Sequence, residues 1–150
     1  MSPSSSAAEP RQSQYTRNQE QSSKSLLIIE DDLSIIDFLE TVLDNIRPGL
    51  EWDYATTGEQ GLQLIQDRSK AGFSPPYDLV IADIFLGGEL TGFDSWLECL
   101  EEFPHMPFVM TSSISVDRYL SILNGFAQSP SYLPKPLTVG SCRNVLEEYI

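Results

Sequence analysis

Basic residues and histidine are scarce in this sequence. Only 9 of its 150 residues are lysine or arginine, against 22 aspartates and glutamates, which gives a formal net charge of −13. Binding to DNA requires clustered lysines and arginines that neutralise phosphates, so we expect no direct DNA binding. The single histidine, His105, follows a proline and has no second histidine with which to form a ligand set. We expect it on the surface.

Cysteines and long apolar runs are also few. Cys99 and Cys142 are far apart in the sequence, so they form neither a metal-ligand motif nor a disulfide framework, which favours a reducing compartment. No apolar run approaches the roughly 20 residues that span a bilayer, and residues 1–24 lack the apolar stretch of a signal peptide. We expect a cytoplasmic protein without membrane insertion.

Composition divides the chain into a tail and one domain. Residues 1–24 contain seven serines, four glutamines and two prolines, a composition that cannot build a core and predicts a disordered tail. Three basic and two acidic residues give this tail a net charge of +1. Because the whole chain has a net charge of −13, residues 25–150 have a net charge of −14. With 41% apolar residues, the chain can fill one core, and residues 25–150 are predicted to form a single domain.

Strand-like and helical patterns alternate along this domain. Apolar residues at helical spacing follow each short apolar run, and Thr57 to Gln60 has the sequence of a capping box. Such alternation predicts an α/β fold with a parallel sheet and right-handed crossovers. The predicted strands are 26–29, 51–55, 77–82, 107–111 and 131–133, and the helical patterns cover 35–46, 57–65, 93–100, 115–126 and 139–146.

Four of the strand-like runs are followed by polar residues. Glu30 and Asp31 follow the first run, Asp83 the third, Ser112 the fourth and Lys135 the fifth. Because the carboxyl ends of parallel strands lie along one edge of the sheet, these side chains should converge there.

The converging residue types favour a particular chemistry. Three neighbouring carboxylates raise one another's pKa unless a cation lies between them, and an oxygen-rich cluster suits Mg²⁺. A lysine ammonium and a serine hydroxyl both suit the oxygens of a phosphoryl group in transfer. The sequence therefore predicts a site for a metal ion and a phosphoryl group.

The same segments resemble the receiver domain of two-component response regulators, in order and roughly in spacing, over residues 25–150. The resemblance implies a flavodoxin-like (βα)5 fold, a doubly wound parallel sheet with strand order 2-1-3-4-5, in a regulator of the single-domain type. The matching motifs are IIEDD at 28–32, DLVIAD at 78–83, MTS at 110–112 and YLPKP at 132–136.

The resemblance also implies roles for the metal site and its acceptor. Asp83 is expected to be the phosphoacceptor and Asp31 a direct ligand of Mg²⁺, for which Mn²⁺ can substitute. Glu30 is expected to act through metal-bound water, and the backbone carbonyl of Phe85 to complete the metal shell.

The other motif residues are expected to bind the phosphoryl group and transmit its presence. Ser112 would contact the phosphoryl group and move with it, Lys135 would be its charge partner, and Tyr132 would be the aromatic switch. The family typically has a cis peptide at Lys135-Pro136. Asp83, Ser112 and Lys135 thus form the expected catalytic set.

Two bulky positions bear on the lifetime of the phosphorylated state. Phe85 follows Asp83 by two residues, and Ile114 follows Ser112 by two. In the family these positions line the path of the hydrolytic water. Because both side chains are apolar here, we expect the water to be poorly positioned and the phosphoryl group to be long-lived.

The resemblance implies protein partners rather than a turnover enzyme. The phosphoryl donor would be a histidine kinase or a histidine phosphotransfer protein, and the domain would catalyse only its own phosphorylation and dephosphorylation. Its helix 4, strand 5 and helix 5 would form the face that signals to a downstream protein effector. The same face could mediate a homodimer.

The sequence departs from the family in its loops, and it also bears on three other classes of protein. Gly87 stands near the usual proline, Gly92 comes one residue late, and residues 124–131 are expanded. A haloacid dehalogenase-type phosphatase needs a second acid where Phe85 stands, and a dinucleotide-binding protein needs a glycine-rich turn after the first strand. A pseudo-receiver that binds partners without phosphorylation remains the alternative, although such a domain would be expected to lose Asp83, the acidic pair or Lys135.

Overall fold

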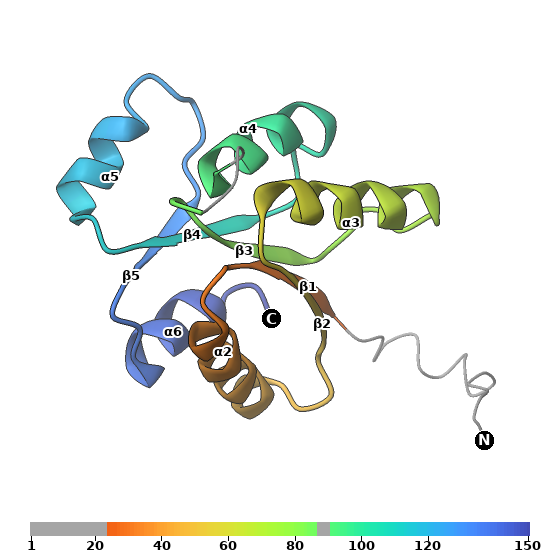
Figure 1. The fold of residues 1–150 in the computed structure, drawn as a ribbon, viewed down its shortest axis with the longest axis horizontal. Coiled ribbons are helices and arrows are strands. Elements are labelled where there is room, and N and C mark those ends of the chain that lie inside the picture. Colours follow the sequence, from red (N-terminus) through yellow and green to blue (C-terminus); the bar gives the residue numbers. More distant parts are fainter. Residues whose placement is uncertain (1–23, 87–90) are drawn as a thin grey trace.

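The computed structural model describes residues 24–86 and 91–150 (Figure 1). The predicted tail covers residues 1–24, of which 1–23 lie outside the described residues. Gly87 also lies outside them. Five strands alternate with five helices in these ranges. The strands are β1 (Ser25–Ile29), β2 (Glu51–Ala55), β3 (Leu79–Asp83), β4 (Phe108–Ser112) and β5 (Ser131–Pro134), and the helices are α2 (Leu33–Ile46), α3 (Gly58–Lys70), α4 (Gly92–Glu102), α5 (Val116–Ile122) and α6 (Val139–Leu146).

The strands form one parallel sheet in the order β2-β1-β3-β4-β5. This order confirms the predicted fold class. The order in which successive strands join the sheet reverses between β1 and β3, although the two strands are parallel. In register, Ile29 at the end of β1 lies opposite Ala82, and Asp83 at the end of β3 lies opposite Thr111. The residues that follow these strands therefore start from the same edge of the sheet.

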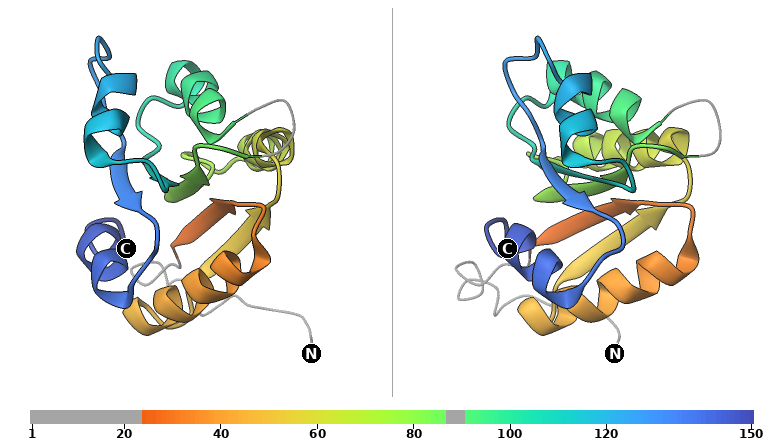
Figure 2. Two further views of the ribbon diagram at one scale, coloured as in Figure 1. Left: turned by 60° about the vertical axis from the view of Figure 1, so that its left-hand side comes forward. Right: turned by 90° about the vertical axis from the view of Figure 1, so that its left-hand side faces the viewer.

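Helices cover both faces of the sheet, with α2 and α6 on one face and α3, α4 and α5 on the other (Figures 1 and 2). Alternate strand residues point to opposite faces, so each face has its own apolar core. Leu26 and Ile28 pack on the side of α2, whereas Leu27 and Ile29 pack on the side of α3. Burial on both faces explains why β1, β3 and β4 read as nearly continuous apolar runs.

The single histidine and the two cysteines differ in their exposure to solvent. His105 is exposed, as expected. Cys99 and Cys142 are free and buried, and burial raises the pKa of the Cys99 thiol to about 12. Within the described ranges, no helix has the length and apolar character needed to cross a bilayer.

The helix predicted over 115–126 is shorter than its apolar pattern indicates. Helix α5 ends at Ile122, and the chain turns at Gly125, whose φ of +96° is accessible to glycine at little cost. Among the apolar residues of this pattern, Tyr119 and Leu123 are buried, whereas Val116 and Leu120 are more than half exposed. The glycine turn therefore overrides the helical period beyond residue 122.

Helix capping also differs in detail from the sequence pattern. The Thr57 hydroxyl accepts from the backbone N–H of Gln60, as predicted, but the Gln60 side chain accepts from the N–H of Thr56 rather than Thr57. The reciprocal pair that defines a capping box occurs instead at α4, between Thr91 and Asp94, and at α6, between Thr138 and Ser141. The cap of α4 fixes the point at which this helix begins beside the end of β3.

Helix α4 approaches the backbone of β3 so closely that only glycine fits at its first position. A Cβ atom added to Gly92 would overlap the carbonyl oxygen of Asp83 and lie 3.2 Å from the Cβ of Ala82. A glycine at this position thus sets the distance between α4 and the strand end that carries Asp83.

We predict that Gly92→Ala destabilises the domain by about 2 kcal/mol, because the added methyl group must displace backbone. Gly140→Ala in α6 is the matched control: a Cβ there meets nothing within 4 Å, and alanine should stabilise the helix by about 0.5 kcal/mol. Urea unfolding of both variants measures the difference. Equal stability of the two variants would contradict the close approach.

Candidate functional site

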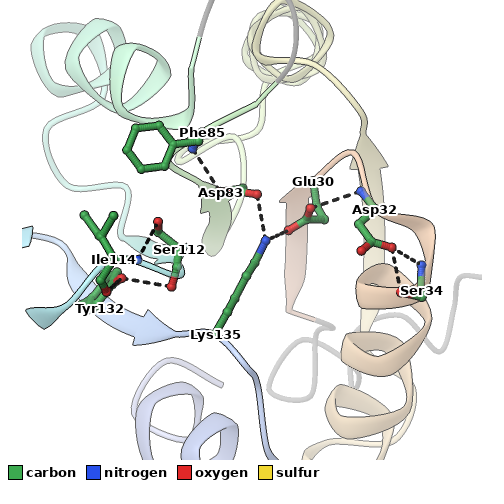
Figure 3. Close-up of polar contacts among 9 residues, drawn as sticks. All are labelled: Glu30, Asp32, Ser34, Asp83, Phe85, Ser112, Ile114, Tyr132 and Lys135. Atoms are coloured by element: carbon green, nitrogen blue, oxygen red, sulfur yellow. Dashed lines mark hydrogen bonds and ion pairs between the residues drawn. The ribbon is translucent and has the colours of Figure 1, made fainter.

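Three predicted site residues meet at the carboxyl edge of the sheet (Figure 3). Lys135, directly after β5, places its Nζ 2.8 Å from Oδ2 of Asp83 and 3.1 Å from Oε1 of Glu30. Asp83 and Glu30 are 6% and 2% exposed. One ammonium group therefore balances two buried carboxylates that come from different strand ends.

The remaining oxygens of these carboxylates are held by the loops that follow their strands. Oδ1 of Asp83 accepts from the backbone N–H of Phe85 at 3.0 Å. Oε2 of Glu30 accepts from the N–H of Asp32 at 3.1 Å, and Asp32 in turn caps α2. Each carboxylate thus has one oxygen fixed by backbone and the other facing Lys135.

The electrostatics of the site are strongly coupled. Burial, and after it the Asp83 carboxylate, raises the pKa of Glu30 to about 7, although Lys135 opposes both effects. Burial alone would lower the pKa of Lys135, but its hydrogen bonds and charge interactions with Asp83 and Glu30 leave that pKa raised. Lys135 is therefore a cation at neutral pH, but its charge does not fully offset the effects of burial and of Asp83 on the pKa of Glu30.

Asp31 completes an oxygen-rich cluster at the same edge. One carboxylate oxygen from each of Glu30, Asp31 and Asp83 lies within 4.8 Å of the others, with Asp31 on the exposed side. Three carboxylates without nitrogen or sulfur donors suit a hard cation such as Mg²⁺. The backbone N–H of Phe85 donates to Asp83. This bond holds Phe85, whose carbonyl is the predicted backbone ligand, beside the cluster.

Ser112 lies at the end of β4, next to the acidic cluster. Its side chain is buried, and its Oγ accepts from the N–H of Ile114 at 3.3 Å. Its carbonyl accepts from the N–H of Lys135 at 2.8 Å, which joins the ends of β4 and β5. The peptide between Lys135 and Pro136 is cis, as predicted.

Tyr132 reaches from β5 to the segment that carries Ser112. Its hydroxyl donates to the carbonyl of Ile114 at 2.6 Å and also lies 3.0 Å from the carbonyl of Ser112. The predicted aromatic switch and the predicted hydroxyl residue are thus in direct contact. The structure adds Tyr119, whose ring stacks on Tyr132 and which the sequence indicates only as an apolar position of its helix.

The two positions predicted to affect phosphoryl lifetime lie on the same side of Asp83. Phe85 and Ile114 both stand on the side of Asp83 away from Glu30 (Figure 3). Phe85 is 54% exposed, whereas Ile114 packs partly against the core. Apolar groups therefore lie on one side of the Asp83 carboxylate, and acidic groups lie on the other.

The fold is shared with solved receiver domains. The structure resembles a receiver domain protein from Methanospirillum hungatei JF-1, with 26% identity and a TM-score of 0.67, over 85% of this chain and 93% of that one. The receiver domain of NtrX from Brucella abortus gives 25% identity and a TM-score of 0.67, over 83% and 96%. The chain has the fold of a response regulator receiver domain.

Other comparisons agree with this assignment. The chemotaxis protein CheY4 of Vibrio cholerae shares the fold of this receiver domain, with a TM-score of 0.68 and 18% identity, over 86% of this chain and all of that one. The transcriptional regulatory protein ComA of Bacillus subtilis is 29% identical over 96 residues, which are 64% of this chain and only 42% of ComA. No protein-family model matches the sequence.

We predict that Lys135→Met destabilises the receiver domain by about 2 kcal/mol at pH 7 in the absence of divalent cations, because two buried carboxylates lose their shared cation. Lys70→Met at the exposed end of α3 is the control and should change stability by less than about 0.5 kcal/mol. Chemical unfolding measures both. Adding Glu30→Gln to Lys135→Met should restore part of the loss, and no restoration would contradict the charge argument.

Proposed function

We propose that this receiver domain accepts a phosphoryl group on Asp83 from the phosphohistidine of a histidine kinase or a histidine phosphotransfer protein. The observation that carries the proposal is the contact of the Asp83 carboxylate with Lys135 on one side and the acidic cluster of Glu30 and Asp31 on the other. A carboxylate with a fixed cation and a cluster suited to Mg²⁺ is equipped for phosphoryl transfer. Residues 25–150 would form this phosphoacceptor domain.

In the proposed reaction, a carboxylate oxygen of Asp83 attacks the phosphorus atom in line with the bond to the donor imidazole. The new O–P bond forms as the N–P bond breaks, and the histidine nitrogen leaves with its electron pair. Lys135 stabilises the charge on the transferring group, and the Ser112 hydroxyl can donate to one of its oxygens. The backbone N–H of Phe85 keeps the carboxylate oriented.

The acidic cluster fits Mg²⁺, and Mn²⁺ could take the same ligands. Asp31 and Asp83 would hold the ion directly, Glu30 would contact it through water, and the carbonyl of Phe85 would add a further oxygen. When bound, the ion supplies positive charge to the carboxylates and to phosphoryl oxygens. Its positive charge would offset the repulsion between Glu30 and Asp83, which together with burial raises the pKa of Glu30.

The signal would leave the domain through the face formed by α5, β5 and α6, which are helix 4, strand 5 and helix 5 in the family's numbering. Movement of Ser112 towards the phosphoryl group would change its contact with Tyr132 and so the shape of this face. A downstream protein effector, or a second copy of the domain, would bind the changed face. The domain would act as a switch rather than as a turnover enzyme.

Phosphorylation can be tested with acetyl phosphate and intact-mass measurement. We expect a gain of one phosphoryl group that requires Mg²⁺ and is lost in Asp83→Asn. Asp94→Asn, within the cap of α4, is the matched control and should keep the gain. No gain in the wild-type chain with either Mg²⁺ or Mn²⁺ would overturn the proposal and favour a pseudo-receiver that binds partners without phosphorylation.

We predict that the phosphoryl group is long-lived because Phe85 and Ile114 offer no polar group to position water. Phe85→Asn should therefore accelerate loss of the phosphoryl group roughly tenfold, equivalent to about 1.4 kcal/mol of activation free energy. Phe73→Asn is the control, since Phe73 is 50% exposed and Phe85 54%. Mass measurement after removal of acetyl phosphate gives the rates, and equal rates for wild type and Phe85→Asn would contradict the prediction.

A further inference from the structure

Two tyrosines lie face to face between α5 and β5. The ring centroids of Tyr119 and Tyr132 are 4.2 Å apart, and their planes differ by 13°. Aromatic pairs at this separation attract one another beyond the effect of area burial. The predicted switch residue, Tyr132, is therefore not a free rotor but one member of a stacked pair.

Tyr119 is firmly fixed in this pair. It is 2% exposed, and its hydroxyl donates to the carbonyl of Pro130 at 2.6 Å. Pro130 directly precedes β5, so the bond joins α5 to the start of the strand that carries Tyr132. Turning the Tyr119 ring would break this buried hydrogen bond and open the core around it.

Tyr132 is held from two directions at once. Its ring rests on Tyr119, and its hydroxyl donates to the carbonyl of Ile114, close to that of Ser112. These partners are an aromatic ring and backbone carbonyls, so their strength does not depend directly on the charge at Asp83. The stack thus presses Tyr132 against the segment that carries Ser112.

Apart from Tyr119, helix α5 makes few buried contacts with the core. Within Val116–Ile122, all of it described, the buried side chain is Tyr119, whereas Val116 and Leu120 are 51% and 54% exposed. Leu123 adds an apolar contact just beyond the helix. Any shift of the Tyr132 ring therefore acts on the main attachment point of α5.

We propose that Tyr119 is a positioning residue that holds Tyr132 against the Ser112–Ile114 segment and makes α5 move together with Tyr132. The holding role follows from the stack itself, whereas its use in signalling rests on the proposed phosphoacceptor function. A change at Ser112 would then reach the α5 face through the stacked pair as a unit. Outward rotation of Tyr132 requires the stack to separate first.

The test places 3-fluorotyrosine at position 132 of the full chain and follows its ¹⁹F signal without any phosphodonor. Tyr119→Phe keeps the ring and should keep the wild-type signal. Tyr119→Leu removes the ring and should raise the solvent-exposed population of Tyr132 about three- to tenfold, the range that loss of an aromatic pair allows. The solvent isotope shift of the signal measures that population.

Leu123→Ala separates positioning from general packing, because it removes buried apolar contact near Tyr119 without removing the stack. It should lower stability but leave the ¹⁹F signal of residue 132 in place. If Tyr119→Leu does not fold, Tyr119→Met replaces it. An unchanged signal in the folded Leu or Met variant, or the same signal change in Leu123→Ala, would overturn the proposal.

Acetyl phosphate and Mg²⁺ are then added, and the chain's mass is recorded beside the ¹⁹F signal. A mass gain with a signal that responds more in Tyr119→Leu than in Tyr119→Phe supports both proposals. A dependence on Tyr119 without mass gain supports positioning and overturns the phosphoacceptor function. A mass gain without any dependence of the ¹⁹F signal on Tyr119 supports the phosphoacceptor function and overturns the positioning role.

Discussion

The interaction on which this site depends is the contact of one lysine with two buried carboxylates. Glu30 and Asp83 come from adjacent strands and would repel each other in a nearly dry environment, yet Lys135 reaches both from the end of a third strand. The chain is strongly acidic, with a net charge of −13, so this local cation is not part of a general basic surface. Charge compensation at one point joins the ends of β1, β3 and β5.

Backbone groups turn that compensated cluster into an oriented one. The N–H groups of Phe85 and Asp32 each hold a carboxylate oxygen, and glycine at position 92 lets α4 pack directly on the carbonyl of Asp83. Asp83 is therefore restrained through its side chain and its main chain together. In the proposed phosphoryl transfer, such preorganisation would reduce the rearrangement required when charge moves.

The sequence predicted the sheet and the meeting of the strand ends because both depend on strong local signals. Buried parallel strands read as apolar runs, and Asp83 or Lys135 stands directly after such a run, so topology alone brings them together. It could not predict the Tyr119–Tyr132 stack, because an apolar period does not distinguish a packing residue from a positioning one. It also overextended α5, since the turn at Gly125 ends a pattern that the period would continue.

Strand β5 and the residue after it connect the chemistry of the site with its surface. Tyr132 and Lys135 are three residues apart, and the N–H of Lys135 binds the carbonyl of Ser112, beside which the hydroxyl of Tyr132 also lies. A shift of Ser112 must therefore alter contacts of both residues. Because Tyr132 is stacked on Tyr119, the buried residue of α5, a small displacement at the strand end would reach a helix in which Val116 and Leu120 are more than half exposed. Under the proposed function, this series of contacts would carry the effect of a charge change at Asp83 to the protein surface.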